Sequence, residues 1–178
     1  MKILVVVDMQ NDFITGPLGN KECQSVVGNV ADIVKSGNYD RIIVTRDTHY
    51  KNYHNTQEGR KLPVEHCIIN TDGWQIQKDV QDALNTIEEN KITYLNKITF
   101  GSIELSNIIK KLASDNNAII IDFVGVCTGI CVISNAMIVK ASAPEADIRI
   151  IENACACVTP DSHINAIEAM KMCQIEII

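Results

Sequence analysis

The sequence predicts a doubly wound α/β protein, a three-layer sandwich in which helices cover both faces of a mostly parallel six-stranded sheet. Short apolar runs recur along the chain, and segments with a helical period lie between several of them. The runs are continuously apolar rather than alternating, which is typical of strands that are covered on both faces. Their alternation with helices predicts parallel strands joined by right-handed crossovers.

Six segments are expected to form the strands, and Val and Ile dominate most of them. They are residues 3–7, 42–45, 92–97, 118–126, 147–151 and 174–178. The helical period is clearest in residues 102–113, 130–141 and 160–170. Apolar residues spaced three or four apart give each of these three segments one face that can pack on the sheet.

Residues 47–74 depart from this alternation. The segment is polar, contains Gly59 and Pro63, and holds three of the four histidines of the chain. Long irregular loops in compact domains usually carry function or are disordered, and we expect this one to be functional. Since the sequence has neither internal repeats nor linker-like stretches, residues 1–178 are expected to form a single domain.

The composition disfavours several classes of protein. The chain has 16 basic and 22 acidic residues, a net charge of -6, and no basic cluster interleaved with aromatic residues. Nucleic-acid binding is therefore not expected, and a small molecule is the expected partner. Because no apolar run approaches the roughly 20 residues of a membrane span, and the first apolar stretch is too short for a signal peptide, we expect a cytoplasmic protein without membrane contact. The seven cysteines follow no disulfide framework and are expected to be reduced.

Reactive side chains follow four of the predicted strands. Asp8 ends the first strand, Asp47 and then His49 follow the second, Lys97 ends the strand over 92–97, and Cys131 comes just after residues 118–126. In an open parallel sheet, ligands bind outside the carboxyl ends of the strands. We therefore expect these side chains to share one rim of the sheet.

Cys131 is the candidate nucleophile because it opens a predicted helix. Unpaired backbone N–H groups and the helix dipole favour a thiolate at that position, and a lysine ammonium favours it further. We expect Lys97 to supply that charge and Asp8 to accept the thiol proton and return it to the departing amine. Each residue also has a structural interpretation: a packed thiol, a solvated strand end and a surface lysine.

The polar segment 47–74 also has the donor groups of a metal site. Asp47, His49, His54 and His66 offer one carboxylate and three imidazoles, a set that suits Zn²⁺, Fe²⁺ or Mn²⁺. Asp47 and His49 are two residues apart, so an extended backbone would place both on one face. A metal here would orient the amide of a substrate toward Cys131. The alternative is a solvated loop that happens to be rich in histidine.

In these residues the sequence resembles the isochorismatase-like cysteine hydrolases, and within them the nicotinamidases. The matching motifs occur in the family's order and are DMQNDF (8–13), TRDTH (45–49), PVEHC (63–67) followed by TDG (71–73), KITF (97–100) and GVCTGICV (125–132). The resemblance implies a triad of Cys131, Asp8 and Lys97. It also implies a metal set of Asp47, His49 and His66, with His54 as a candidate fourth ligand.

The same resemblance implies further features of the site. The peptide between Val126 and Cys127 is expected to be cis, and the amides of Cys127 and Cys131 are expected to form an oxyanion hole. Phe13 would correspond to an aromatic wall of the substrate pocket. Family members usually form dimers or higher oligomers, so a homo-oligomer is expected.

Two departures from the nicotinamidase pattern concern the substrate. Pro63, preceded by Leu62, stands where nicotinamidases commonly have a tryptophan three residues before the loop histidine, which leaves Leu62 as the expected pocket residue. Gly129 stands where an acidic residue is frequent.

The expected function is metal-assisted hydrolysis of nicotinamide to nicotinate and ammonia through a thioester on Cys131. One alternative is a related cysteine hydrolase that acts on another small amide, an N-carbamoyl compound or isochorismate. A second alternative, from a different class, is a non-catalytic protein that binds a metal or a small ligand.

Overall fold

A six-stranded, wholly parallel sheet forms the centre of the computed structural model, which describes residues 1–116 and 118–178. The strands are β1 (Lys2–Val7), β2 (Arg41–Asp47), β3 (Ile92–Lys97), β4 (Ile120–Val126), β5 (Asp147–Ala156) and β6 (Glu176–Ile177), in the spatial order β3-β2-β1-β4-β5-β6. The predicted doubly wound, Rossmann-like α/β class is confirmed. The chain builds outward from β1 to β3 and then returns to β4 on the other side of β1. This reversal places the switch point of the fold between β1 and β4.

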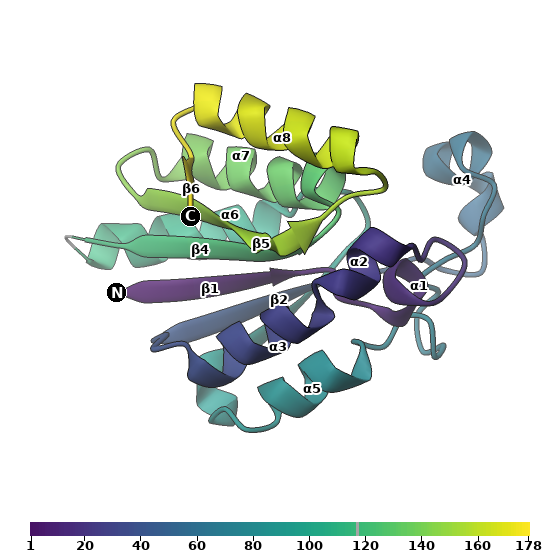
Figure 1. The fold of residues 1–178 in the computed structure, drawn as a ribbon, viewed down its shortest axis with the longest axis horizontal. Coiled ribbons are helices and arrows are strands. Elements are labelled where there is room, and N and C mark those ends of the chain that lie inside the picture. The colour runs from purple at the N-terminus through teal and green to yellow at the C-terminus, as the bar shows by residue number, and fades with distance from the viewer. Residues whose placement is uncertain (117) are drawn as a thin grey trace.

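Helices cover both faces of the sheet (Figure 1). One face carries α2 (Lys21–Ser25), α3 (Val27–Ser36) and α5 (Lys78–Leu84), and the other carries α6 (Ile103–Asp115), α7 (Ile133–Ser142) and α8 (Pro160–Met172). The short helices α1 (Asn11–Ile14) and α4 (Gln57–Lys61) lie beyond the carboxyl ends of the strands, where α4 stands apart from the sandwich (Figure 1). Single turns occur at η1 (Tyr53–Asn55), η2 (Glu89–Lys91) and η3 (Thr128–Val132).

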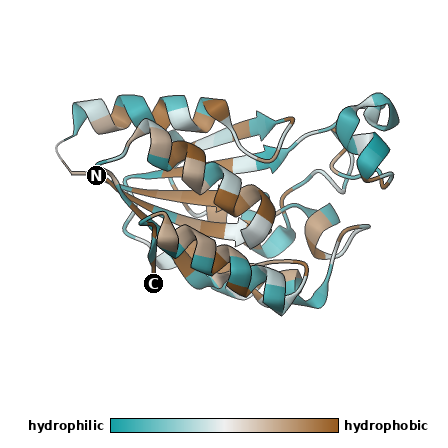
Figure 2. Ribbon diagram, turned by 90° about the horizontal axis from the view of Figure 1, so that it is seen from above, coloured by the Kyte–Doolittle hydropathy of each residue, from teal (hydrophilic) through white to brown (hydrophobic). Residues whose placement is uncertain are grey.

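The apolar run of β1 shows why its sequence is continuous rather than alternating. Ile3, Val5 and Val7 belong to the core under α6, α7 and α8, whereas Leu4 and Val6 belong to the core under α3 and α5. All five side chains are fully buried. Figure 2 shows the same pattern, because the central strands are mostly hydrophobic and the helical segment that stands apart from them is mostly hydrophilic.

Several boundaries differ from the sequence-based expectation, and α7 begins at Ile133, so Cys131 lies before that helix. β5 continues to Ala156 because its pairing with β4 resumes at Gly125 and Cys155 after a register shift. β6 has only two residues, and Gln174, with a positive φ of 62°, lies in the turn between α8 and β6. The segment 47–74 is not wholly irregular, because it contains η1 and α4.

No helix in the described parts of the chain, 1–116 and 118–178, is both long and apolar enough to cross a membrane. The cytoplasmic location, the homo-oligomeric state and the single-domain organisation stay predictions from the sequence.

Candidate active site

The carboxyl ends of β1, β2 and β3 bring Asp8, Asp47 and Lys97 to one edge of the sheet. Asp47 and Lys97 are register partners in the pairing of β2 with β3. Asp8 follows β1 directly and has a φ of 49°, a left-handed conformation that aspartate tolerates better than most residues and that turns the chain out of the strand. Thr45 fixes the Asp8 carboxylate by donating its hydroxyl to Oδ1 at 2.7 Å.

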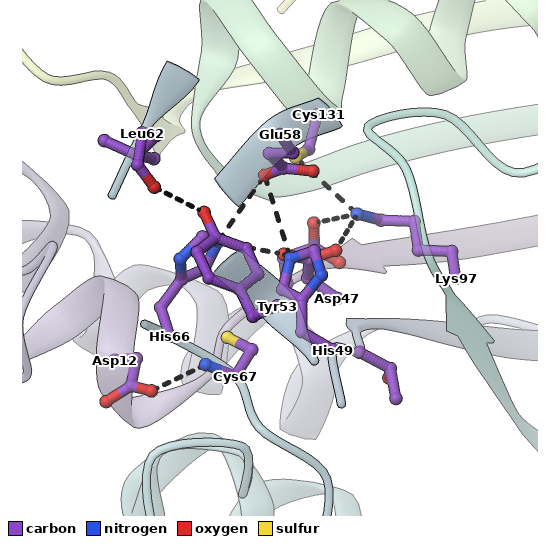
Figure 3. Close-up of polar contacts among 12 residues, drawn as sticks. Asp12, Asp47, His49, Tyr53, Glu58, Leu62, His66, Cys67, Lys97 and Cys131 are labelled. Carbon is purple, nitrogen blue, oxygen red and sulfur yellow. Dashed lines mark hydrogen bonds and ion pairs between the residues drawn. The ribbon is translucent and has the colours of Figure 1, made fainter. Parts of the chain in front are cut away.

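Lys97 connects the reactive groups at this edge. Its Nζ lies 2.6 Å from Oδ2 of Asp8, 3.6 Å from Sγ of Cys131 and 3.6 Å from Oδ1 of Asp47. Figure 3 shows the lysine side chain reaching from its strand toward Asp47 and Cys131. Asp8, Lys97 and Cys131 are all buried. The structure therefore brings the three predicted triad residues together, and their catalytic roles stay predictions.

Burial and neighbouring groups together set the protonation states of Asp8, Lys97 and Cys131. Burial raises the pKa of Asp8, and the nearby Lys97 charge offsets only part of that increase. Burial alone would lower the pKa of Lys97, but the charges of Asp8 and Asp47 and the hydrogen bond to Asp8 outweigh it and raise that pKa. The pKa of the Cys131 thiol is raised well above its usual range, first by burial and then by the Asp8 carboxylate. The site therefore rests with Lys97 as an ammonium and Cys131 as a thiol, whereas the sequence argument favoured a preformed thiolate.

Cys131 lies in the one-turn π-helical segment η3, between β4 and α7. The peptide between Val126 and Cys127 is cis, as the resemblance implied. The Cys127 carbonyl accepts hydrogen bonds from the amides of Ile130 and Val132, at 3.0 and 3.1 Å. These contacts close the turn that presents Cys131. The oxyanion-hole role of Cys127 and Cys131 stays a prediction.

Asn135 supports this turn and was not recognised from the sequence. Its side-chain nitrogen donates to the carbonyls of Cys131 at 2.8 Å and Phe100 at 3.1 Å. Its side-chain oxygen accepts from the amide of Ser102 at 2.9 Å. Asn135 is fully buried, so it ties the Cys131 turn to the loop that follows Lys97. An asparagine inside a predicted helix gives no sequence signal for such a role.

A second group of side chains lies beside Lys97 and has the donor set of a metal site. Asp47, His49, Glu58 and His66 place one ligand atom each within 4.8 Å of one another. Oδ2 of Asp47 lies 2.9 Å from Nε2 of His49 and 3.4 Å from Nε2 of His66. Oε1 of Glu58 lies 3.7 Å from both of these nitrogens (Figure 3).

The hydrogen bonds around this group orient its ligand atoms toward one another. His66 donates its Nδ1 hydrogen to the carbonyl of Val64 at 2.9 Å, and this contact turns its Nε2 toward the group. Asp47 directs Oδ2 toward the histidines and Oδ1 toward Lys97. Two imidazole nitrogens and two carboxylate oxygens match the ligand preference of a divalent transition metal.

His54 was the candidate fourth ligand, and the structure does not bring it into this group. Its side chain is 55% exposed, and its Nε2 lies 3.2 Å from Oε1 of Glu65. Glu58 occupies the fourth position instead. The glutamate reaches the histidines from α4, which begins at the cap formed by the Thr56 hydroxyl and the Gly59 amide. In sequence Glu58 resembles any solvated glutamate, so no pattern could identify it.

Gln10 is a second residue that the sequence did not identify. It is fully buried, and its Nε2 donates to the carbonyls of Asp47 at 2.8 Å and Trp74 at 2.9 Å. Its Oε1 accepts from the amide of Asp47 at 2.7 Å. Nearby, Asp12 accepts from the amide of Cys67 at 2.7 Å, which fixes the residue after His66. The DMQNDF motif thus holds residues near both ends of the segment 47–74 in place.

A cavity of about 540 Å³ opens beside the metal group. His49 and Glu58 line it on one side, and Leu62, Ile98 and Phe100 line it on another. Leu62 thus lines a cavity, and its contact with substrate stays a prediction. Phe13 does not line this cavity, but its ring lies 5.5 Å from the ring of His66 and so flanks the metal group.

The fold and the geometry define a parallel α/β protein with a buried thiol, carboxylate and ammonium at its switch point. The Isochorismatase domain family matches residues 2–178, and the chain belongs to that family.

Individual relatives agree with this membership. The chain is 36% identical over 116 residues to a nicotinamidase from Saccharomyces cerevisiae, an alignment that covers 48% of this chain and 53% of the relative. The match thus spans about half the length of that curated relative. Among solved structures, the pyrazinamidase/nicotinamidase from Streptococcus mutans UA159 has a TM-score of 0.87 and 22% identity over 100% of both chains. The pyrazinamidase of Pyrococcus horikoshii in complex with zinc has a TM-score of 0.79 and 24% identity, with 99% of this chain and 98% of that chain covered.

Proposed function

We propose that the protein is a metal-assisted cysteine amidohydrolase that cleaves a small carboxamide, with nicotinamide as the first candidate substrate. The observation that carries this proposal is the buried contact of the Lys97 ammonium with both Asp8 and Cys131. A packed thiol alone would not require a carboxylate and an ammonium beside it in the core. The names of the relatives support an aromatic carboxamide as substrate, since they denote nicotinamide and pyrazinamide hydrolysis.

In the proposed reaction, the Cys131 sulfur attacks the carboxamide carbon and its proton passes to Asp8. Asp8 then returns the proton to the departing ammonia, and a thioester remains on Cys131. Water attacks the thioester with Asp8 again as base, which releases the acid and restores the thiol. The raised pKa of Asp8 makes its carboxylate a stronger base for both transfers.

Lys97 would remain an ammonium throughout, because its pKa is raised. Its charge would stabilise the thiolate that develops on Cys131 and would hold the Asp8 carboxylate in place. The backbone amides of Cys127 and Cys131 would donate to the oxyanion of the tetrahedral intermediate, an effect worth about 3–4 kcal/mol per donor in related chemistry.

Asp47, His49, Glu58 and His66 would hold a divalent ion, Zn²⁺ or otherwise Fe²⁺ or Mn²⁺. The Nε2 atoms of both histidines and the two carboxylate oxygens lie close enough together to fit such an ion. When bound, it would supply Lewis-acid polarisation and a ligand position for a ring nitrogen or oxygen of the substrate. The cavity lined by Leu62 and Phe100 would receive the ring.

Ammonia release from nicotinamide by the metal-replete protein tests the proposal. We expect release that is abolished in Cys131→Ala and unchanged in Cys173→Ser, a substitution at the end of α8. A parallel screen of other small amides, N-carbamoyl compounds and isochorismate identifies the related hydrolases. Absence of turnover on every compound, together with uniform alkylation of all seven thiols, would instead indicate a non-catalytic binding protein.

A further inference from the structure

A second group of thiols lies behind the Cys131 turn and takes no part in the proposed reaction. Cys23 of α2, Cys127 before η3 and Cys157 after β5 come from three separate parts of the chain. The thiol of Cys127 lies in hydrogen-bonding contact with the sulfurs of both Cys23 and Cys157. Cys23 also directs its Sγ to the carbonyl of Cys157 at 4.0 Å. Three reduced cysteines thus meet at one point without a disulfide.

Cys157 has the surroundings of a stabilised thiolate. Its sulfur lies in contact with the thiol of Cys127, the hydroxyl of Ser162, and the backbone N–H groups of Gly129 and Val158. The hydrogen bond from Cys127 is the largest effect, and together with the other donors it outweighs burial and lowers the pKa of Cys157 to about 5. Groups that donate hydrogen bonds to a sulfur favour its reactive anionic form.

Gly129 packs closely against the sulfur of Cys157. A Cβ atom at position 129 would lie only 3.3 Å from Sγ of Cys157, which is closer than an ordinary contact. A glycine at this position therefore fits beside the sulfur without any shift of the two residues. A negative side chain here would also oppose a thiolate on Cys157.

Small molecules can approach Cys157 from two sides, although the residue is buried. It lines a hollow of about 270 Å³ together with His163 and Ile164, and a second hollow of about 380 Å³ together with Ile130 and Asn165. Cys23 lines neither of these hollows and is fully buried. Cys127 is partly exposed but lines neither hollow, so Cys157 is the thiol of the trio that faces both of them.

We propose that Cys157 is a peroxide-reactive cysteine and that Cys127 resolves its oxidised form into a reversible disulfide. The Cys157 sulfur attacks one oxygen of hydrogen peroxide, the O–O bond breaks, and hydroxide leaves and takes a proton from solvent. The Cys127 sulfur then attacks the sulfenic acid, an S–S bond forms, the S–O bond breaks, and water leaves with the Cys127 proton. Two thiols lose two electrons, and the peroxide is reduced to water.

The disulfide would act on the neighbouring site through the backbone. The Cys127 carbonyl accepts from the amides of Ile130 and Val132, which close the turn around Cys131. A covalent tie from Cys127 to Cys157 would restrain that turn. The effect on turnover rests on the proposed function, whereas formation of the bond does not.

The first experiment measures how fast each thiol is alkylated in the 178-residue protein loaded with Zn²⁺, a metal that is not redox-active. A limiting dose of iodoacetamide at neutral pH is followed by peptide mass spectrometry, with fragment spectra that separate Cys155 from Cys157 and Cys127 from Cys131. We expect Cys157 to react at least about tenfold faster than Cys155 and Cys173. Cys155 is a matched internal control, since it is buried nearby and burial raises its pKa to about 12. Equal rates for Cys157 and Cys173 would overturn the proposal.

The second experiment uses Cys131→Ala protein, so that oxidation of the candidate nucleophile cannot interfere. One equivalent of hydrogen peroxide should yield a Cys127–Cys157 disulfide, which dithiothreitol reverses, and Cys173→Ser in the same background should behave identically. Cys157→Ser should abolish this bond, with its far-UV circular dichroism unchanged. A Cys23–Cys127 disulfide, or higher oxidation of Cys157 without any disulfide, would contradict the assignment. Because this measurement needs no substrate, its outcome is independent of the proposed amidase activity.

Discussion

Nζ of Lys97 lies 2.6 Å from Oδ2 of Asp8, and both side chains are buried at the carboxyl end of the sheet. Removal of one member of such a pair leaves an uncompensated charge in the core, which usually costs about 3–5 kcal/mol. The pair is therefore a structural element as well as the proposed centre of proton transfer. The two roles can be separated by substitution.

Lys97→Met should lower the free energy of unfolding by about 3–5 kcal/mol, because the Asp8 carboxylate loses its counter-charge. Asp8→Asn combined with Lys97→Met removes both charges and should recover much of that loss. Neither protein should release ammonia from nicotinamide, since the base and the ammonium are both needed. Urea denaturation and ammonia release measure the two effects. A double variant that is no more stable than Lys97→Met would contradict the ion-pair interpretation.

Glu58→Gln should weaken Zn²⁺ binding by about tenfold or more, since a charged ligand is replaced by a weakly coordinating amide. His54→Gln is the matched control, because that exposed histidine lies outside the metal group. A ligand that binds only the folded state raises the melting temperature. Added Zn²⁺ should therefore raise it in the wild type and in His54→Gln, and much less in Glu58→Gln. A larger loss for His54→Gln would restore the ligand set expected from the sequence.

The residues at the carboxyl ends of the predicted strands identified the candidate site, because a parallel sheet brings all of these ends to one edge. Asp8, Asp47, Lys97 and Cys131 each follow a recognisable apolar run, so their proximity is a consequence of topology. Glu58 could not be found in the same way. It lies on α4, away from the sheet, and its position depends on how the loop around Tyr53 packs. A Cβ on Gly59 would lie 2.1 Å from the Tyr53 carbonyl, so this approach requires glycine.

The strand boundaries show a similar limit. The apolar pattern of β5 stops at Ile151, because the exposed Glu152 and Asn153 follow. The strand nevertheless continues, since its pairing with β4 shifts register between Phe123 and Gly125 and then resumes. Hydrophobic periodicity does not encode a register shift. The roles of Gln10 and Asn135 could not be predicted either, because both residues act through hydrogen bonds to backbone groups of distant segments, which a local pattern does not encode.

Gln10→Leu should destabilise the fold and weaken Zn²⁺ binding together. The substitution leaves the amide and carbonyl of Asp47 and the carbonyl of Trp74 without their buried partner, at about 1–3 kcal/mol for each group. Gln24→Leu is a suitable control, because that exposed glutamine makes one bond, to the carbonyl of Ile14, and should cost about 1 kcal/mol or less. Chemical denaturation and Zn²⁺ titration test both effects. Normal metal affinity in Gln10→Leu would show that Gln10 supports the fold alone.

Asp122→Asn should change how stability depends on pH. The Asp122 carboxylate accepts from Nε of Arg149 at 2.7 Å, Nη2 of Arg149 at 2.9 Å and the Tyr39 hydroxyl at 2.8 Å, and Lys2 lies 3.5 Å away. Burial acts to raise the pKa of Asp122, but these partners outweigh it and lower that pKa. A carboxylate whose pKa is lowered in the folded state contributes its full stabilisation above the ordinary aspartate pKa of about 3.9. That contribution is lost as the pH falls through the lower pKa of the folded state. The stability difference between wild type and Asp122→Asn should therefore be constant from pH 7 to about 5 and should shrink below about 4. Urea denaturation over this pH range measures the stability difference, and Asp32→Asn, at an exposed position, is the control. A stability difference that grows toward low pH would contradict the assigned ion pair.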